Sequence, residues 1–194
     1  MPVLGRRGVP VDWLIVGLGN PGAEYAWTPH NIGFLVAERL RSRFDLGKPK
    51  ARYRGLLNEG RAGVGGPRVA ILLPQTYMND AGRSVGPARG ELRVDLDHLL
   101  VIHDEIDLPF GDIRVRRGGG LAGHNGLKSL RAALGSADFH RVRIGVGRPP
   151  TTDPDRVAAY VLGKFREPKE AVELLIERGA DAAEQVLREA EPAS

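Results

Sequence analysis

Short apolar runs and amphipathic segments alternate along this chain, and the alternation limits the possible folds more than any other feature. Residues 13–18 form a continuous apolar run typical of a buried strand, and residues 32–40 then repeat apolar side chains at helical spacing. Further strands are predicted at residues 69–73, 99–103, 113–115 and 142–146, and helices at residues 125–134, 155–162 and 172–190. The pattern predicts an α/β domain with a largely central, mixed sheet.

The chain length favours one domain. The 194 residues, 42% of them hydrophobic, suffice for one buried core but are few for two. We place the domain at residues 11–190, after an extension of residues 1–10 that we expect to be flexible and before a tail at residues 191–194. Arg6 and Arg7 precede an apolar stretch that Asp12 interrupts, so neither a signal peptide nor a membrane span is predicted. The absence of cysteine excludes disulfides, thiolate metal sites and a cysteine nucleophile.

Charge is unevenly distributed, although the net charge is only +4. Residues 113–148 contain eight basic side chains and a single acid, Asp138. Residues 167–191 contain eight acids and three bases, and we interpret them as a solvated helix face. The basic stretch indicates a polyanionic partner such as nucleic acid, with a merely solubilising surface as the alternative.

The stretch GLGNPG, residues 17–22, has the letters of the dinucleotide-binding pattern G-x-G-x-x-G. That pattern requires its glycines to lead directly into a helix whose backbone N–H groups meet a pyrophosphate. Here Pro21 removes one N–H group, and a polar stretch, residues 23–28, separates the last glycine from the helical pattern. No acid follows at the end of a second strand, so a nucleotide-dependent oxidoreductase is disfavoured.

His30 is the first candidate catalytic residue. Thr28 and Pro29 have the form of an N-cap followed by proline at the first helical position, which places His30 in the first turn of a helix. The positive end of a helix dipole disfavours imidazolium, so such a histidine tends to remain a neutral base. Taken alone, a histidine that only packs or caps is the better interpretation.

The acidic cluster HDEID, residues 103–107, could suggest a metal site or paired catalytic carboxylates. Successive side chains of a strand point to opposite faces, so Asp104 and Glu105 are expected to point apart. One short acidic run cannot enclose a cation by itself. We therefore expect no metal here and no other cofactor.

Five separated motifs span residues 14–165: LIVGLGNPGAEYAWTPHNIGF, PQTYMNDAGRSV, VIHDEIDLPFGDIRVRRGGGLAGHNGLKSL, FHRVRIGVGRP and VLGKF. Together and in this order, they resemble the motifs of the bacterial-type peptidyl-tRNA hydrolases. The resemblance implies one α/β domain with a mixed sheet surrounded by helices. It also implies cleavage of the ester between a peptide and the 3′ ribose of its tRNA, which recycles tRNA from peptides released early.

The resemblance assigns roles to two residues weighed above. His30 matches the family's catalytic histidine, a general base on the attacking water, which is a role typically worth about 10²- to 10⁴-fold in rate. Asp104 matches the acid that orients this histidine and stabilises its imidazolium form. The helix dipole and the carboxylate shift the histidine pKa in opposite directions, and the sequence leaves open which effect is larger.

The resemblance also identifies a substrate site. Three asparagines match family positions there: Asn20, Asn79 and Asn125. An uncharged amide suits substrate binding because it both donates and accepts hydrogen bonds. We expect Asn20 to support the reacting ester and the other two to bind the peptide and the RNA 3′ end. Tyr25 and Met78 are expected to line the cleft. For asparagines beside glycine or proline, the alternative role is turn formation. For Tyr25 and Met78, the alternative role is ordinary packing.

The basic stretch acquires a specific role from the resemblance. Arg114, Arg116 and Arg143 match the family's basic positions, and contacts to acceptor-stem phosphates are implied for them, with Lys128 and Arg131 as helpers. This chain has Pro29 where the family commonly has arginine and Ala81 in place of a common serine. We thus expect the protein to be a cytoplasmic monomer whose partner is peptidyl-tRNA. The alternative is a non-catalytic RNA-binding protein, which would not need His30 or Asp104.

Overall fold

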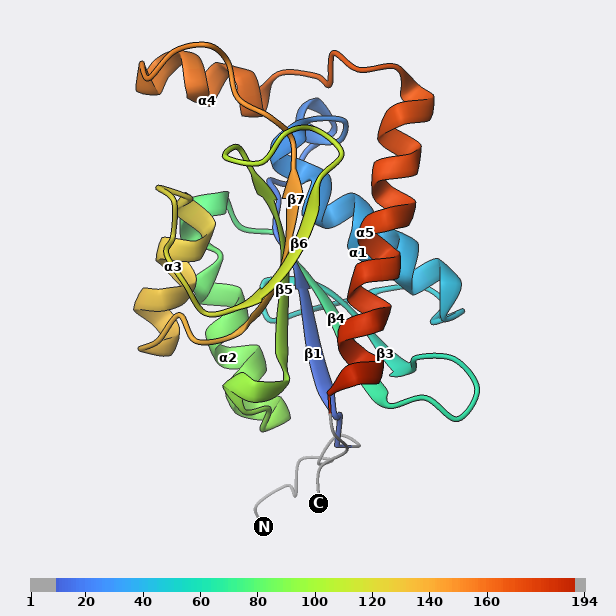
Figure 1. Cartoon of the computed structure of the whole chain (residues 1–194). Coiled ribbons are helices and arrows are strands. Elements are labelled where there is room, and N and C mark those ends of the chain that lie inside the picture. Colours follow the sequence, from blue (N-terminus) through green and yellow to red (C-terminus); the bar gives the residue numbers. More distant parts are fainter. Residues whose placement is uncertain (1–9, 191–194) are drawn as a thin grey trace.

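The computed structural model describes residues 10–190, which form one sheet of seven strands with helices on both faces (Figure 1). The predicted extension and tail lie, except for Pro10, outside the described residues. The strands are β1 (Trp13–Gly17), β2 (Lys50–Arg52), β3 (Gly55–Arg61), β4 (Arg68–Pro74), β5 (Leu99–Glu105), β6 (Ile113–Arg117) and β7 (His140–Gly145). Their order is β2-β3-β4-β1-β5-β7-β6.

The sheet is mixed, as predicted. Strands β4, β1, β5 and β7 are parallel and occupy the centre, where β1 and β5 are buried throughout. Strands β2 and β3 pair antiparallel at one side, and β6 pairs antiparallel with β7 at the other. The central strands therefore end together at one edge of the sheet, as the carboxyl ends of parallel strands do in α/β folds that carry a site there.

Five α-helices and four short 3₁₀ turns complete the described residues. The helices are α1 (Ile32–Arg43), α2 (Gly82–Leu92), α3 (Asn125–Leu134), α4 (Pro154–Leu162) and α5 (Lys169–Glu189). The 3₁₀ turns are η1 (Ala23–Tyr25), η2 (Pro29–Asn31), η3 (Met78–Asp80) and η4 (Leu96–His98). Among residues 10–190, no helix combines the length and apolar character needed to cross a membrane.

Two apolar layers hold the helices to the sheet. One layer joins α1 and α5 to the face that carries Ile15, Ile71 and Ile102, and the other joins α2 and α3 to the opposite face. Figure 1 shows the two helix pairs on either side of the sheet and α4 across the carboxyl edge of the central strands. The Tyr160 hydroxyl in α4 donates to Val146 O at 2.7 Å, which ties this helix to the end of β7.

The acidic stretch near the C-terminus differs in part from its predicted role as a solvated face. Arg43 of α1 forms ion pairs with Glu177, Asp181 and Glu184 of α5, and Arg39 pairs with Glu173 and Glu177. These half-exposed pairs add little stability individually, but they join two helices that already share an apolar contact. The acids thus help to fix α5 against α1.

Candidate active site

Close packing of α1 against the sheet places His30 at the carboxyl edge. A Cβ on Gly33 would lie 2.3 Å from Ile102 O and 2.6 Å from Leu18 O, so only glycine permits this approach. His30 lies just before α1 in η2, where Thr28 is the N-cap residue and Pro29 follows it, as predicted. The Thr28 hydroxyl does not cap this turn, however, and instead donates to Tyr25 O at 2.9 Å.

A chain of hydrogen bonds joins His30 to Asp104 and then to His124. His30 Nδ1 lies 2.8 Å from Asp104 Oδ2, and His124 Nε2 lies 2.7 Å from Asp104 Oδ1. His124 is also the N-cap of α3, where its Nδ1 accepts from Gly126 N at 3.1 Å and Leu127 N at 3.2 Å. Because Nδ1 accepts, the proton of neutral His124 is on Nε2 and is donated to Asp104.

The tautomer of His30 follows from the same chain. Asp104 is an ionised carboxylate that only accepts, so His30 Nδ1 carries the hydrogen that it shares with Oδ2. The other ring nitrogen, Nε2, is then an unprotonated base in neutral His30. No residue among those described forms a hydrogen bond with it. It is the ring atom available to take a proton from water.

The electrostatics of the three groups are coupled. Burial would raise the pKa of Asp104, but His30 and His124 outweigh burial and hold that pKa well below its usual range. Burial would lower the pKa of His30, but the carboxylate of Asp104 outweighs it, so the His30 pKa lies above its ordinary 6.5. The net shift of the His30 pKa therefore has the direction that the carboxylate favours, against burial.

His103 extends the row of rings behind His124. Its ring packs edge-on against that of His124, with centroids 5.2 Å apart, and its Nδ1 donates to Asp104 O at 2.8 Å. Burial, followed by the nearby His124, lowers the His103 pKa to about 3. A neutral His103 adds no positive charge beside His124.

His30, Asp104 and His124 have ligand atoms within 4.8 Å of one another, so they are the one cluster in residues 10–190 that could hold a metal ion. The hydrogen bonds argue against that use. In this tautomer His124 Nε2 carries a hydrogen and has no lone pair for a metal. Metal binding at Nε2 would place the hydrogen on Nδ1, and both α3 N–H groups would then lose their acceptor. The arrangement suits proton transfer better than metal binding.

Asn20 lies in the loop after β1 and is held from two sides. Asn31 bonds to its backbone twice, with Asn31 Oδ1 accepting from Asn20 N at 2.8 Å and Asn31 Nδ2 donating to Asn20 O at 2.9 Å. Asn20 Oδ1 accepts from Met78 N at 2.7 Å, which fixes the orientation of the amide. The side-chain NH₂ group has no acceptor among the described residues and is free to donate.

These groups border a cleft of about 810 Å³ at the carboxyl edge of the sheet. Seven of the predicted site residues line it: Asn20, Tyr25, His30, Met78, Asn79, Asp104 and Asn125. Met78 is buried, whereas Asn79 and Asn125 are exposed at the rim. Helix α4 adds an apolar part of the lining, from Val157, Ala158, Val161 and Leu162.

The predicted basic residues lie outside this cleft. Arg114 and Arg116 are exposed on β6, Lys128 and Arg131 are exposed on α3, and Arg143 is half-buried on β7 directly opposite Arg114. Arg143 Nε lies 3.6 Å from Glu105 Oε2. The carboxylate of Glu105 thus lies near an arginine, whereas that of Asp104 contacts two histidines. The two side chains have different partners, in agreement with the expectation that they point apart.

Sequence reasoning missed several residues of the site. The resemblance assigned no role to His124 or Asn31, although both lie within its motifs, and it assigned none to the apolar side chains of α4. A histidine directly before a helix was the available signal for His124, because N-cap residues commonly accept from the first turn. The α4 lining had no such signal, since its contribution depends on where the helix lies in space.

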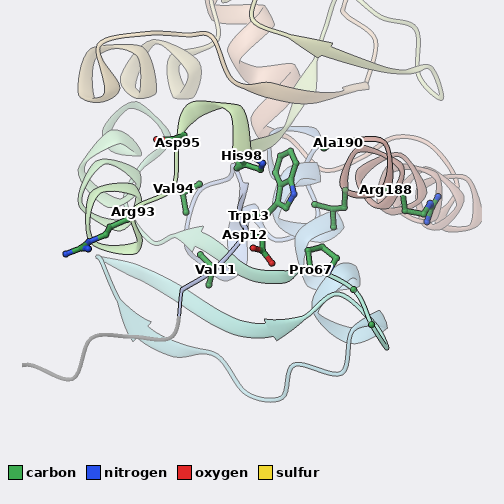
Figure 2. A pocket seen from close by; sticks show the side chains of 13 residues that line it. Val11, Asp12, Trp13, Pro67, Arg93, Val94, Asp95, His98, Arg188 and Ala190 are labelled. Atoms are coloured by element: carbon green, nitrogen blue, oxygen red, sulfur yellow. The ribbon is translucent and has the colours of Figure 1, made fainter. Parts of the chain in front are cut away.

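A second hollow, of about 570 Å³, lies at the other end of the sheet (Figure 2). Asp12, Asp95, Arg93 and Arg188 line it, so its charge is mixed. Asp12 Oδ2 already accepts from Arg68 N at 2.8 Å. Unlike the cleft, this hollow has no histidine paired with a carboxylate among residues 10–190.

Comparison with known proteins identifies the family. The sequence pattern described as "Peptidyl-tRNA hydrolase" matches residues 14–194. The chain belongs to the peptidyl-tRNA hydrolase family. It is therefore a hydrolase that acts on an ester bond.

Individual peptidyl-tRNA hydrolases are similar over nearly their whole length. The peptidyl-tRNA hydrolase of Syntrophotalea carbinolica is 47% identical over 182 residues, which are 88% of this chain and 93% of the relative. That of Mycobacterium sp. (strain KMS) is 48% identical over 183 residues, 93% of each chain. The crystal structure of peptidyl-tRNA hydrolase from Acinetobacter baumannii matches with a TM-score of 0.75 and 35% identity, covering 96% of this chain and 100% of the other.

Proposed function

We propose that this peptidyl-tRNA hydrolase cleaves the ester between a peptide and the 3′ ribose of its tRNA with His30 as general base. The observation that carries the proposal is the bond from His30 Nδ1 to Asp104 Oδ2, which leaves Nε2 free to accept. Nε2 takes a proton from water while the water oxygen attacks the ester carbonyl. Asp104 holds the tautomer and stabilises the imidazolium that forms.

The tetrahedral intermediate places negative charge on the former carbonyl oxygen. The free NH₂ group of Asn20 is our candidate donor to this oxyanion, because Met78 N–H already occupies the amide oxygen. When the intermediate collapses, the ester C–O bond breaks and the 3′ ribose oxygen takes the proton back from His30 Nε2. The products are a peptide carboxylic acid, which releases its proton to solvent, and a tRNA with its 3′ hydroxyl, and these steps use no metal or cofactor.

The remaining assignments concern substrate binding. Asn79 and Asn125 at the rim, with Tyr25 and Met78 in the cleft, are proposed to bind the peptide and the RNA 3′ end. Arg114, Arg116 and Arg143, with Lys128, are proposed to bind acceptor-stem phosphates, which gives affinity without reading sequence. Action as a monomer in the cytoplasm stays a prediction from the family resemblance.

The decisive experiment compares N-acetyl-aminoacyl-tRNA with unblocked aminoacyl-tRNA, for the wild type and His30→Ala. We expect rapid wild-type cleavage of the blocked substrate only, and a loss of about 10²- to 10⁴-fold in kcat on substitution. Equal rates for the two proteins would remove His30 as the base. His98→Ala is the matched control, since His98 lies at the opposite end of the sheet, beside the second hollow.

A further inference from the structure

Arg141 is a buried cation that the proposed mechanism does not use. It lies on β7 directly opposite Arg116 of β6, and only 2% of its surface is exposed. Its guanidinium donates to three backbone carbonyls: Gly120 O at 2.6 Å, Ala137 O at 2.9 Å and Gly119 O at 3.2 Å. Among residues 10–190, no carboxylate forms an ion pair with it.

This arrangement carries an electrostatic cost, although the Phe139 ring packs against the guanidinium, with its centroid 4.9 Å from Arg141 Cζ. A guanidinium stays charged in proteins, and burying it without a carboxylate is costly. Arg116 lies directly across the strand pair from Arg141, and Arg114 lies across from Arg143 two residues further along, so arginines are paired twice between these strands. Local arrangements that oppose stability tend to occur where function requires them.

The carbonyls held by Arg141 fix the direction of the loop that follows β6. In a trans peptide the C=O and N–H groups point in opposite directions. With Gly119 O and Gly120 O directed at Arg141, the N–H groups of Gly120 and Leu121 point away from it. Neither N–H group has an acceptor among the described residues, and Gly119 and Gly120 are exposed.

The same loop supports the side chain of Arg116. Gly119 has φ +102°, and a Cβ there would lie 2.7 Å from both Cζ and Nε of Arg116. The exposed Arg116 guanidinium therefore rests on the Gly119 backbone. Its position depends on a loop that Arg141 holds from within the protein.

We propose that Arg141 is a positioning residue for RNA binding. It holds Gly119 and Gly120 so that the Arg116 guanidinium and the N–H groups of Gly120 and Leu121 together receive one phosphate of the substrate RNA. Successive backbone N–H groups beside a planar guanidinium are a common arrangement for phosphate oxygens. This inference rests on the proposed role of Arg116 in binding phosphate.

The test measures kcat and KM for N-acetyl-aminoacyl-tRNA over a series of salt concentrations. Arg141→Met keeps the length of the side chain but loses its charge and its three hydrogen bonds. We expect KM to rise about tenfold, kcat to change by less than about twofold, and the slope of log KM against log salt to fall by about one. Arg61→Met, which removes the same charge from the far end of β3, is expected to keep the wild-type KM and slope.

Two further variants test the connection to Arg116. If Arg141 acts through Arg116, the double variant Arg116→Gln/Arg141→Met raises KM by less than the product of the two single effects. Arg141→Lys keeps the charge but cannot span the carbonyls with a planar fork, so its KM is expected between those of wild type and Arg141→Met.

The outcomes distinguish a failure of the inference on Arg141 from a failure of the proposed phosphate role of Arg116. A wild-type KM and salt slope in Arg141→Met, beside a raised KM in Arg116→Gln, would overturn the inference alone. A wild-type KM in Arg116→Gln would overturn the phosphate role of Arg116 and the inference with it. If Arg141→Met does not fold, Gly119→Ala displaces Arg116 while Arg141 stays in place, and an unchanged KM there would refute the proposal.

Discussion

His124 donates its Nε2 hydrogen to Asp104 Oδ1 at 2.7 Å while its Nδ1 accepts the first N–H groups of α3. One ring therefore couples the start of a helix to the carboxylate that orients His30. Because the two sides of the ring have opposite hydrogen-bonding roles, the neutral tautomer satisfies both. A positively charged or ring-flipped His124 would break at least one of these connections.

Replacement of His124 tests this coupling. His124→Ala removes the second donor to Asp104 and the cap of α3, so we expect kcat to fall by about tenfold or more and the free energy of unfolding to fall by about 1 kcal/mol. His124→Asn can still cap the helix but is too short to reach Asp104. Recovery of stability without recovery of kcat in His124→Asn would separate the two roles, whereas wild-type kcat in both variants would contradict the coupling.

The pH dependence of activity follows from the raised pKa of His30. In the proposed mechanism the neutral imidazole is the base, so kcat/KM should fall as the pH decreases through a value above 6.5. In Asp104→Asn the carboxylate that raises this pKa is absent while burial, which lowers it, remains. We expect the acid limb to shift to lower pH and the maximal kcat to fall by about 10²- to 10⁴-fold. An unchanged midpoint would show that another group controls the limb.

Asn20 is expected to act on the transition state rather than on binding. Its free NH₂ group is the proposed oxyanion donor, and losing one such donor typically costs about 10²- to 10³-fold in kcat. We therefore expect Asn20→Ala to lower kcat with little change in KM, and Asn79→Ala to raise KM instead. The reverse pattern in steady-state kinetics with N-acetyl-aminoacyl-tRNA would exchange the two assignments.

The close approach at Gly33 predicts a loss of both stability and activity. Gly33→Ala places a Cβ against two backbone carbonyls, and such overpacking costs about 1–3 kcal/mol. The displacement would also move His30, so kcat should fall. Gly90→Ala in α2 is the matched control: no atom lies within 4 Å of the new Cβ, and alanine favours a helix by about 0.5–1 kcal/mol. Urea unfolding of both variants measures the difference.

Arg143 connects the proposed phosphate-binding surface to the site through Glu105, which lies 3.6 Å away. Arg143→Ala should raise KM for the tRNA substrate and lower the slope of log KM against log salt by about one, as expected for the loss of one phosphate contact. The effect on a short ester substrate should be smaller. It also leaves the buried Glu105 without its partner. Arg143→Gln, which can still donate to Glu105, controls for that loss. An unchanged tRNA affinity in both variants would exclude the contact.

Much of the fold follows from local patterns in the sequence. The apolar runs at β1, β4, β5 and β7 and the helix at residues 125–134 were predicted within a few residues. Helix α2 was not, because Gly82, Gly86, Gly90 and Pro87 are poor helix formers that only tertiary packing stabilises. Strands β2 and β3 were also missed, since the three residues of β2 are exposed and β3 has only two adjacent apolar side chains.

The sequence by itself determined the family, the mixed sheet and the identity of most residues at the cleft, because local periodicity and ordered motifs are properties of the chain. Only the tertiary structure decided how these residues act on one another. His30, Asp104 and His124 are far apart in the sequence, and their tautomers and pKa shifts depend on distances and burial that no local pattern encodes. The same holds for Arg141, which the sequence shows as one arginine among many and the fold buries beneath an exposed loop.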